Sequence, residues 1–207
     1  MWAYLAWGTT YAFAAAVQPG PYQAYLVSEA LKNGWRRTLP AALAPVLSDI
    51  PIILLVLFVL RVLAPAVTLA LRAAGGVFLL YLAWRAYRTW RSYRPSVESD
   101  AGVARRSVLS AAAINLLNPN PWLGWSLVMG PLLLKGWRES PAHGVALLVA
   151  FYGTMVVASA GIIVLFAGAR NLGSRVARGL VGVSAAALAC FGCWQLWSGV
   201  AGFVWGG

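Results

Sequence analysis

One carboxylate stands apart among the residues of this chain that could do chemistry. Asp49 lies in the middle of an apolar stretch, residues 38–60, and is the only acid that we expect inside a membrane span. A buried carboxylate is costly unless it is paired, hydrated or protonated, so an acid in such a place is a functional candidate by default. Asp49 is therefore predicted to be a site for a proton, with a role in proton or ion coupling, or for a cationic substrate. A structural acid, hydrogen-bonded to the backbone of a broken helix, is the alternative.

Two matched proline pairs carry the second set of candidates. Pro19 and Pro21 are followed 100 residues later by Pro119 and Pro121. Two prolines break a helix, and inside a membrane a break is tolerated only where the backbone is buried in protein or lines a cavity. The N–H groups of a helix that starts after a break suit an anion, and neighbouring amides add donors and acceptors. We predict a substrate site of Gln18, Pro19, Gly20, Pro21, Tyr22, Asn115, Asn118, Pro119, Asn120 and Pro121, with structural kinks as the alternative.

Two cysteines could carry redox chemistry. Cys190 and Cys193 lie three residues apart and share one helix face. A redox pair is one interpretation, and small apolar packing residues are the one that we favour. No metal site is expected, because the single histidine, His143, lies in a predicted loop. No catalytic constellation or cofactor motif is present in the sequence, so an enzyme is not expected.

The composition indicates an integral membrane protein. Of 207 residues, 61% are hydrophobic and 10% are charged, whereas soluble domains are about a quarter charged. The net charge of +11 does not indicate nucleic-acid binding, because the basic residues lie between apolar spans, as loops of membrane proteins require. We expect membrane lipid to surround such a protein. The sequence is also compatible with a homo-oligomer.

Six membrane-spanning helices fill the length of the chain, at about 20 residues each. We expect an all-α fold with six helices. The first covers residues 3–17 and continues, after its break, over 22–31. The fourth covers 108–134 and is broken at Pro119, and the other four cover 38–60, 66–87, 141–167 and 178–197. The whole chain, residues 1–207, forms a single membrane domain. It divides into a first repeat (about 1–90), a linker (about 91–107) and a second repeat (about 108–207).

The basic residues predict how the helices are oriented. The three odd-numbered connections hold 12 of the 16 basic residues: Lys32, Arg36, Arg37, Arg85, Arg88, Arg91, Arg94, Arg105, Arg106, Arg170, Arg175 and Arg178. The positive-inside rule places these connections in the cytoplasm and both termini outside. Because each half has three helices, the second half enters from the opposite side, so the repeat is inverted. This 3+3 architecture, with broken first and fourth helices, is typical of secondary transporters.

These motifs together resemble a known family. Pro19-Gly20-Pro21, the short basic loop after it, Asp49, and Asn115-Leu116-Leu117-Asn118-Pro119 resemble the lysine-exporter (LysE) type translocator family. The resemblance implies an exporter of amino acids or related small solutes, driven by the proton or ion gradient, in the bacterial inner membrane. The chain departs from the family pattern at Gln18, Tyr22 and Asn120, and these departures bear on the substrate more than on the fold.

Three other functions are weighed against a secondary exporter. A membrane thiol or electron carrier would need cysteines near the breaks, whereas Cys190 and Cys193 lie in the predicted last helix. A metal-cation exporter is disfavoured by one loop histidine and a single buried acid. A non-transporting membrane scaffold would need neither Asp49 nor two matched breaks.

The basic-residue asymmetry predicts opposite sides for two connections. We expect a cysteine at Ser96 to be labelled only from the cytoplasmic side, and one at Ser140 only from outside, by an impermeant thiol reagent in cells. The background carries alanine at Cys190 and Cys193. Labelling of both positions from one side would contradict the inverted repeat.

Overall fold

The computed structural model describes residues 1–18, 20–58, 65–91, 100–169 and 174–205. These residues form helices and no β-strand, which confirms the all-α class. The first half contains α1 (Trp2–Val17), α2 (Pro21–Asn33), α3 (Trp35–Thr38), the 3-10 turn η1 (Leu39–Leu43), α4 (Ala44–Phe58) and α5 (Pro65–Arg91). The second half contains α6 (Asp100–Leu117), α7 (Pro119–Gly124), the π-helical turn η2 (Trp125–Met129), α8 (Gly130–Glu139), α9 (Pro141–Gly168) and α10 (Ser174–Trp205).

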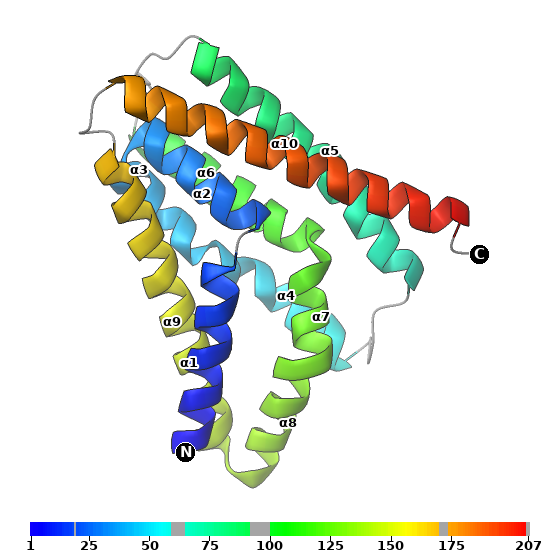
Figure 1. Cartoon of the computed structure of the whole chain (residues 1–207). Coiled ribbons are helices and arrows are strands. Elements are labelled where there is room, and N and C mark those ends of the chain that lie inside the picture. The colour runs from blue at the N-terminus through cyan, green and yellow to red at the C-terminus, as the bar shows by residue number, and fades with distance from the viewer. Residues whose placement is uncertain (19, 59–64, 92–99, 170–173, 206–207) are drawn as a thin grey trace.

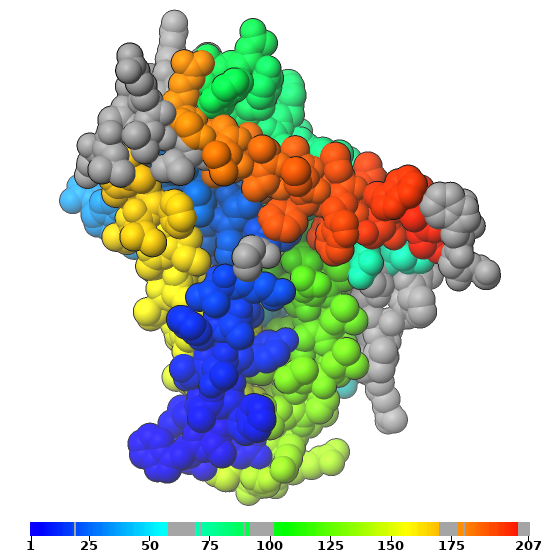
Figure 2. All heavy atoms as spheres, in the orientation of Figure 1, coloured from blue at the N-terminus to red at the C-terminus, as the bar shows by residue number. Residues whose placement is uncertain are grey.

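The helices are those of a membrane protein. In the described part of the chain, three stretches are long and apolar enough to cross a bilayer: Trp35–Leu57, Pro141–Gly168 and Val181–Gly202. The outward surfaces of α1, α9 and α10, which form much of the face seen in Figure 2, carry large exposed apolar side chains such as Trp2, Val157 and Trp197. The number of six spans remains a prediction.

Several helix limits differ from the prediction: α10 (Ser174–Trp205) extends beyond residues 178–197 at both ends, and α5 continues to Arg91 instead of ending at residue 87. The helix expected over residues 38–60 contains η1, because Pro40 lacks an N–H group and the backbone tightens there. The helix expected to begin at residue 108 begins at Asp100, eight residues earlier. The first turns of α6 are polar in composition, which is why the sequence analysis placed them in a linker. They are nevertheless amphipathic, because Val103 and Ser107 are buried while the two arginines between them are exposed.

The helices pack into two apolar cores. One core joins α2, α5, α6 and α10 through buried residues such as Leu26, Leu79 and Leu188. The other joins α1, α4, α8 and α9 through residues such as Ile52 and Leu147. Figure 1 shows α5 beside α10 in one layer, and α1 beside α9 below it. The helical path is interrupted twice, between α1 and α2 and between α6 and α7. Both helix interruptions lie where the two cores meet.

Glycines bring α5 and α10 into close contact. A Cβ atom on Gly76 would lie 2.5 Å from the backbone nitrogen of Leu196 and 2.8 Å from the carbonyl oxygen of Gly192. A Cβ atom on Gly199 would lie 2.6 Å from the backbone nitrogen of Ala73. Small residues are what lets two membrane helices approach this closely, since packing rather than the hydrophobic effect drives their association.

Replacement of Gly76 by alanine tests this contact. The added methyl group meets backbone atoms that cannot turn away, so we expect Gly76→Ala to destabilise the protein by about 1–3 kcal/mol. Gly153→Ala on α9 is the matched control, because nothing lies within 4 Å of its Cβ position. Thermal unfolding of both variants in detergent measures the difference. Equal melting temperatures would show that the α5–α10 contact is not close-packed.

Candidate functional site

A cavity of about 140 Å³ lies between the two chain interruptions. On the same measure one water needs about 10–15 Å³, so the cavity has room for a small solute. Nine of the predicted site residues line it: Gln18, Gly20, Pro21, Tyr22, Asp49, Asn115, Asn118, Asn120 and Pro121. Pro119 is buried at the start of α7 and does not line the cavity, and Pro19 lies outside the described residues.

The first interruption exposes the carbonyl groups at the end of α1. Gln18 and Gly20 adopt extended backbone, and Pro21 is the first residue of α2. The side-chain nitrogen of Gln23 donates to the carbonyl oxygens of Ala15 (3.1 Å) and Ala16 (3.0 Å). A side chain of the second helix thus satisfies backbone acceptors that the first helix leaves open.

The second interruption is held in the same way. Asn118 is extended, and its Oδ1 accepts a hydrogen bond from the backbone nitrogen of Asn120 at 3.1 Å, which caps α7. The indole nitrogen of Trp122 donates to the carbonyl oxygen of Leu116 at 2.9 Å. In both places a side chain that follows the interruption bonds a carbonyl group at the end of the helix before it.

Asp49 is the only charged residue among the described residues of the cavity wall, and its side chain is buried. One carboxylate oxygen, Oδ1, accepts from the side-chain nitrogen of Asn115 at 2.7 Å. The other, Oδ2, accepts from the indole nitrogen of Trp125 at 3.1 Å and from the hydroxyl of Tyr152 at 3.3 Å. These neutral donors replace part of the hydration that burial removes.

The predicted amides divide into two kinds. Asn115 and Asn118 are already engaged, in the bond to Asp49 and in the cap of α7. Gln18 and Asn120 are exposed on the cavity wall, and no described residue hydrogen-bonds their side chains. Gln18 and Asn120 are therefore the amides best placed to meet a solute.

An aromatic wall was missed by the sequence analysis. Tyr11, Trp125 and Phe151 line the cavity, and Phe151 stacks edge-on against both Trp125 (5.6 Å between ring centroids) and Tyr152 (4.9 Å). The sequence held one signal for it. Tyr152 follows Asp49 by 103 residues, the same spacing that separates Lys32 from Lys135.

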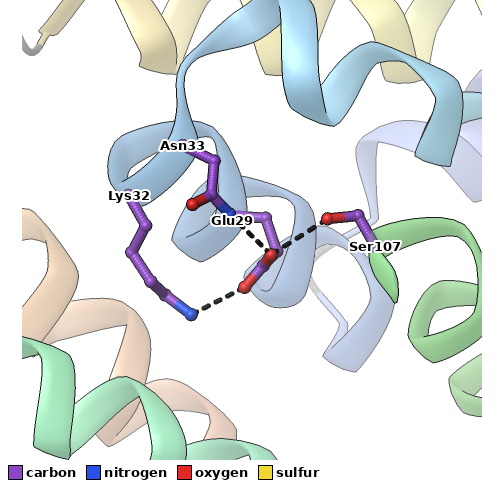
Figure 3. A network of polar contacts seen from close by, with 4 residues as sticks. All are labelled: Glu29, Lys32, Asn33 and Ser107. Atoms are coloured by element: carbon purple, nitrogen blue, oxygen red, sulfur yellow. Dashed lines mark hydrogen bonds and ion pairs between the residues drawn. The ribbon is translucent and has the colours of Figure 1, made fainter. Parts of the chain in front are cut away.

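A second buried acid was also missed, and the expectation that Asp49 is the only acid inside a predicted span is wrong. Glu29 lies within the predicted continuation of the first helix and is only 8% exposed. Its carboxylate accepts from Lys32 (2.6 Å), Asn33 (2.9 Å) and Ser107 (3.0 Å), as Figure 3 shows. Because Ser107 belongs to α6, this network ties α2 to α6.

The cysteines lie away from the cavity. Cys190 and Cys193 are free thiols exposed on α10, and neither lines the cavity. Within the described residues, no group of three or more histidine, cysteine or acidic side chains could hold a metal ion.

One known protein family matches the chain over most of its length. The model of the LysE type translocator family matches residues 13–199, which include both interruptions and Asp49. This match confirms the resemblance that the motifs predict. No curated protein and no solved structure matches the chain.

Loss of the Glu29 carboxylate is predicted to destabilise the protein strongly. In Glu29→Gln, the ammonium group of Lys32, whose side chain is 13% exposed, loses its anion, and breaking a buried pair costs about 3–5 kcal/mol. Glu139→Gln, whose carboxylate is 45% exposed, is the control and should have little effect on thermal unfolding in detergent. Adding Lys32→Met to Glu29→Gln should restore much of the stability. An additive double mutant would show that the pair is not coupled.

Proposed function

The chain belongs to the LysE type translocator family, and from this premise we propose that it is a secondary exporter of amino acids or related small solutes. One observation carries the proposal. A cavity with a single buried carboxylate lies between two matched helix interruptions, where secondary transporters place substrate and coupling sites. The N-terminal end of α2 and the amides of Gln18 and Asn120 supply donors for the solute.

Asp49 is the proposed proton-coupling group. No lysine or arginine among the described residues lines the cavity, so no cation holds the carboxylate in its charged form. Burial disfavours that charge, whereas the three hydrogen-bond donors favour it. An acid balanced in this way can gain and lose a proton as the cavity changes its exposure to the two sides of the membrane.

The proposed 3+3 inverted repeat agrees with the helix contacts. In such a repeat, contact between the first and fifth spans implies contact between the fourth and second. α1 packs along α9, and α6 and α7 contact α4. The third and sixth spans are partners of each other, and α5 packs along α10 (Figure 1). Two similar halves that can exchange conformations support alternating access.

Polar contacts join helices of the two halves at two places away from the cavity wall. Glu29 of α2 accepts from Ser107 of α6 near one end of the molecule. Tyr4 of α1 donates to Glu139 of α8 at 2.9 Å near the other end, the lower end in Figure 1. We assign these two ties as the contacts that open in turn when the cavity faces one side.

We place the protein in a bacterial inner membrane, with both termini outside. The basic residues of the odd-numbered connections support this orientation. In this orientation the Glu29 tie lies on the cytoplasmic side, next to Lys32, and the Tyr4 tie lies outside.

The alternatives receive less support. A thiol carrier would need its cysteines at the cavity, and Cys190 and Cys193 are exposed on α10. A metal-cation exporter would need several hard or soft ligands around Asp49, whereas the groups that contact its carboxylate are an amide, an indole and a phenol.

Asp49→Asn separates coupling from substrate movement. The amide keeps the size of the side chain and is neutral, so we expect the variant to fold and to lose efflux that is driven by a pH gradient. Exchange of substrate at equal pH, which needs no net proton movement, should survive. Proteoliposomes loaded with a panel of amino acids and cations, with and without a pH gradient, measure both rates.

Tyr81→Phe, which removes an exposed hydroxyl on α5 outside the cavity, is the control for this experiment. Full gradient-driven efflux by Asp49→Asn, together with a lower melting temperature, would identify Asp49 as a structural acid. Absence of solute movement by the unmodified protein across the whole panel would contradict the exporter itself.

A further inference from the structure

The two oxygens of the Asp49 carboxylate have different surroundings. Oδ1 faces the side-chain nitrogen of Asn115, which also donates to the hydroxyl of Ser48 at 2.8 Å. The hydrogen of that hydroxyl goes to the carbonyl oxygen of Ala44 at 2.9 Å. Ser48 can therefore only accept from Asn115, and this arrangement orients the amide so that an N–H group points at Oδ1.

Oδ2 has one partner that can only donate and one that can reverse. The indole nitrogen of Trp125, at 3.1 Å, has no acceptor capacity. The hydroxyl of Tyr152, at 3.3 Å, donates to a charged carboxylate, and it becomes an acceptor when its hydrogen rotates away. Among the described partners of Oδ2, only Tyr152 can receive a hydrogen bond from a protonated Asp49.

A proton on Oδ1 would be far less favourable. It would face the N–H group of Asn115, and relief would require both the amide to flip and the Ser48 hydroxyl to turn from the Ala44 carbonyl toward the amide. A proton on Oδ2 requires only the rotation of one hydroxyl hydrogen. We propose that Tyr152 is the positioning residue for proton exchange, which accepts the hydrogen bond from Oδ2–H when Asp49 is protonated and donates to Oδ2 when Asp49 is charged.

This inference rests on the proposed role of Asp49 in coupling. The proton comes from water in the cavity and binds Oδ2, while the phenol of Tyr152 stays neutral and turns its hydrogen away. Tyr152 is only partly buried, so its hydroxyl hydrogen has room to rotate away from Oδ2. The side chain therefore acts as a reversible partner and does not need to ionise.

No other described group near Asp49 is placed for this role. From α1 and α2, Tyr11 and Tyr22 line the cavity, but no described hydrogen bond joins either phenol to the carboxylate, and the hydroxyl of Tyr22 donates to the Ala41 carbonyl. The described parts of η1 and α7 contribute no titratable side chain, and Asn115 is the α6 residue at the carboxylate. The charged residues of α8 lie beside Val56, about 10 Å along α4 from Asp49.

Tyr152→Phe tests the inference because it removes the reversible partner and keeps the ring. In proteoliposomes, we expect efflux driven by a pH gradient to fall about tenfold, the effect of losing a hydrogen bond to a charged group. Exchange at equal pH should change much less, and the pH profile of net transport should be displaced. Tyr81→Phe, which removes an exposed hydroxyl on α5, is the matched control and should behave like the unmodified protein.

Infrared difference spectroscopy adds a measurement that would be unchanged if Tyr152 had a purely structural role. The carbonyl stretch of protonated Asp49, assigned by its absence in Asp49→Asn, should change frequency in Tyr152→Phe, because its hydrogen-bond partner is gone. If Tyr152→Phe does not fold, difluorotyrosine at position 152 keeps the shape and weakens the phenol as an acceptor. It should displace the same band and the same pH profile.

The outcomes separate the two proposals. Suppose that Asp49→Asn loses coupling, but the variants at position 152 keep the pH profile and the Asp49 carbonyl band of the unmodified protein. This result overturns the role of Tyr152 and leaves the exporter intact. Retention of coupling in Asp49→Asn overturns proton coupling at Asp49, and the role of Tyr152 with it. Loss of coupling in both, with a shifted profile, supports both.

Discussion

A peptide group that leaves a helix inside a membrane must find a new hydrogen-bond partner, and the centre of this protein depends on that constraint. Gln23 reaches back to the last carbonyls of α1, and Trp122 reaches back to Leu116 at the end of α6. These side chains let the backbone turn without a helical partner. The cavity exists because both interruptions are satisfied from within the protein.

The carboxylate of Asp49 depends on the same chemistry. Its donors come from three separate elements, since Asn115 lies on α6, Trp125 in η2 and Tyr152 on α9. A lysine or arginine would stabilise the charged form far more strongly than these neutral groups do. The absence of a cation from the described cavity wall leaves the charge of Asp49 responsive to its hydration, which a coupling group requires. Glu29 shows the opposite solution, because Lys32 pairs with it directly.

The parts of the fold that were predictable follow from short-range rules. A pair of prolines one residue apart disfavours a continuous helix, so the end of α6 before Pro119 and the start of α2 at Pro21 could be read from the chain, although the single Pro51 lies inside α4. Long apolar runs have few alternatives to a membrane helix, so α9 was placed to within one residue at its end. The start of α6 was not found, because the turn that contains Val103 and Ser107 is polar in composition and buried on one face only.

The candidate site was predictable only as a set of positions. The sequence by itself determined that two proline pairs and the acid Asp49 lie in apolar stretches of one chain, because helix breaking and the cost of a buried charge depend on residue type. It could not show which amides are engaged, that Glu29 is paired, or that an aromatic wall faces Asp49. Those facts were decided by the tertiary structure, since they depend on how α1, α4, α6 and α9 cross, and hydrogen bonds form only between atoms that the packing brings within about 3 Å.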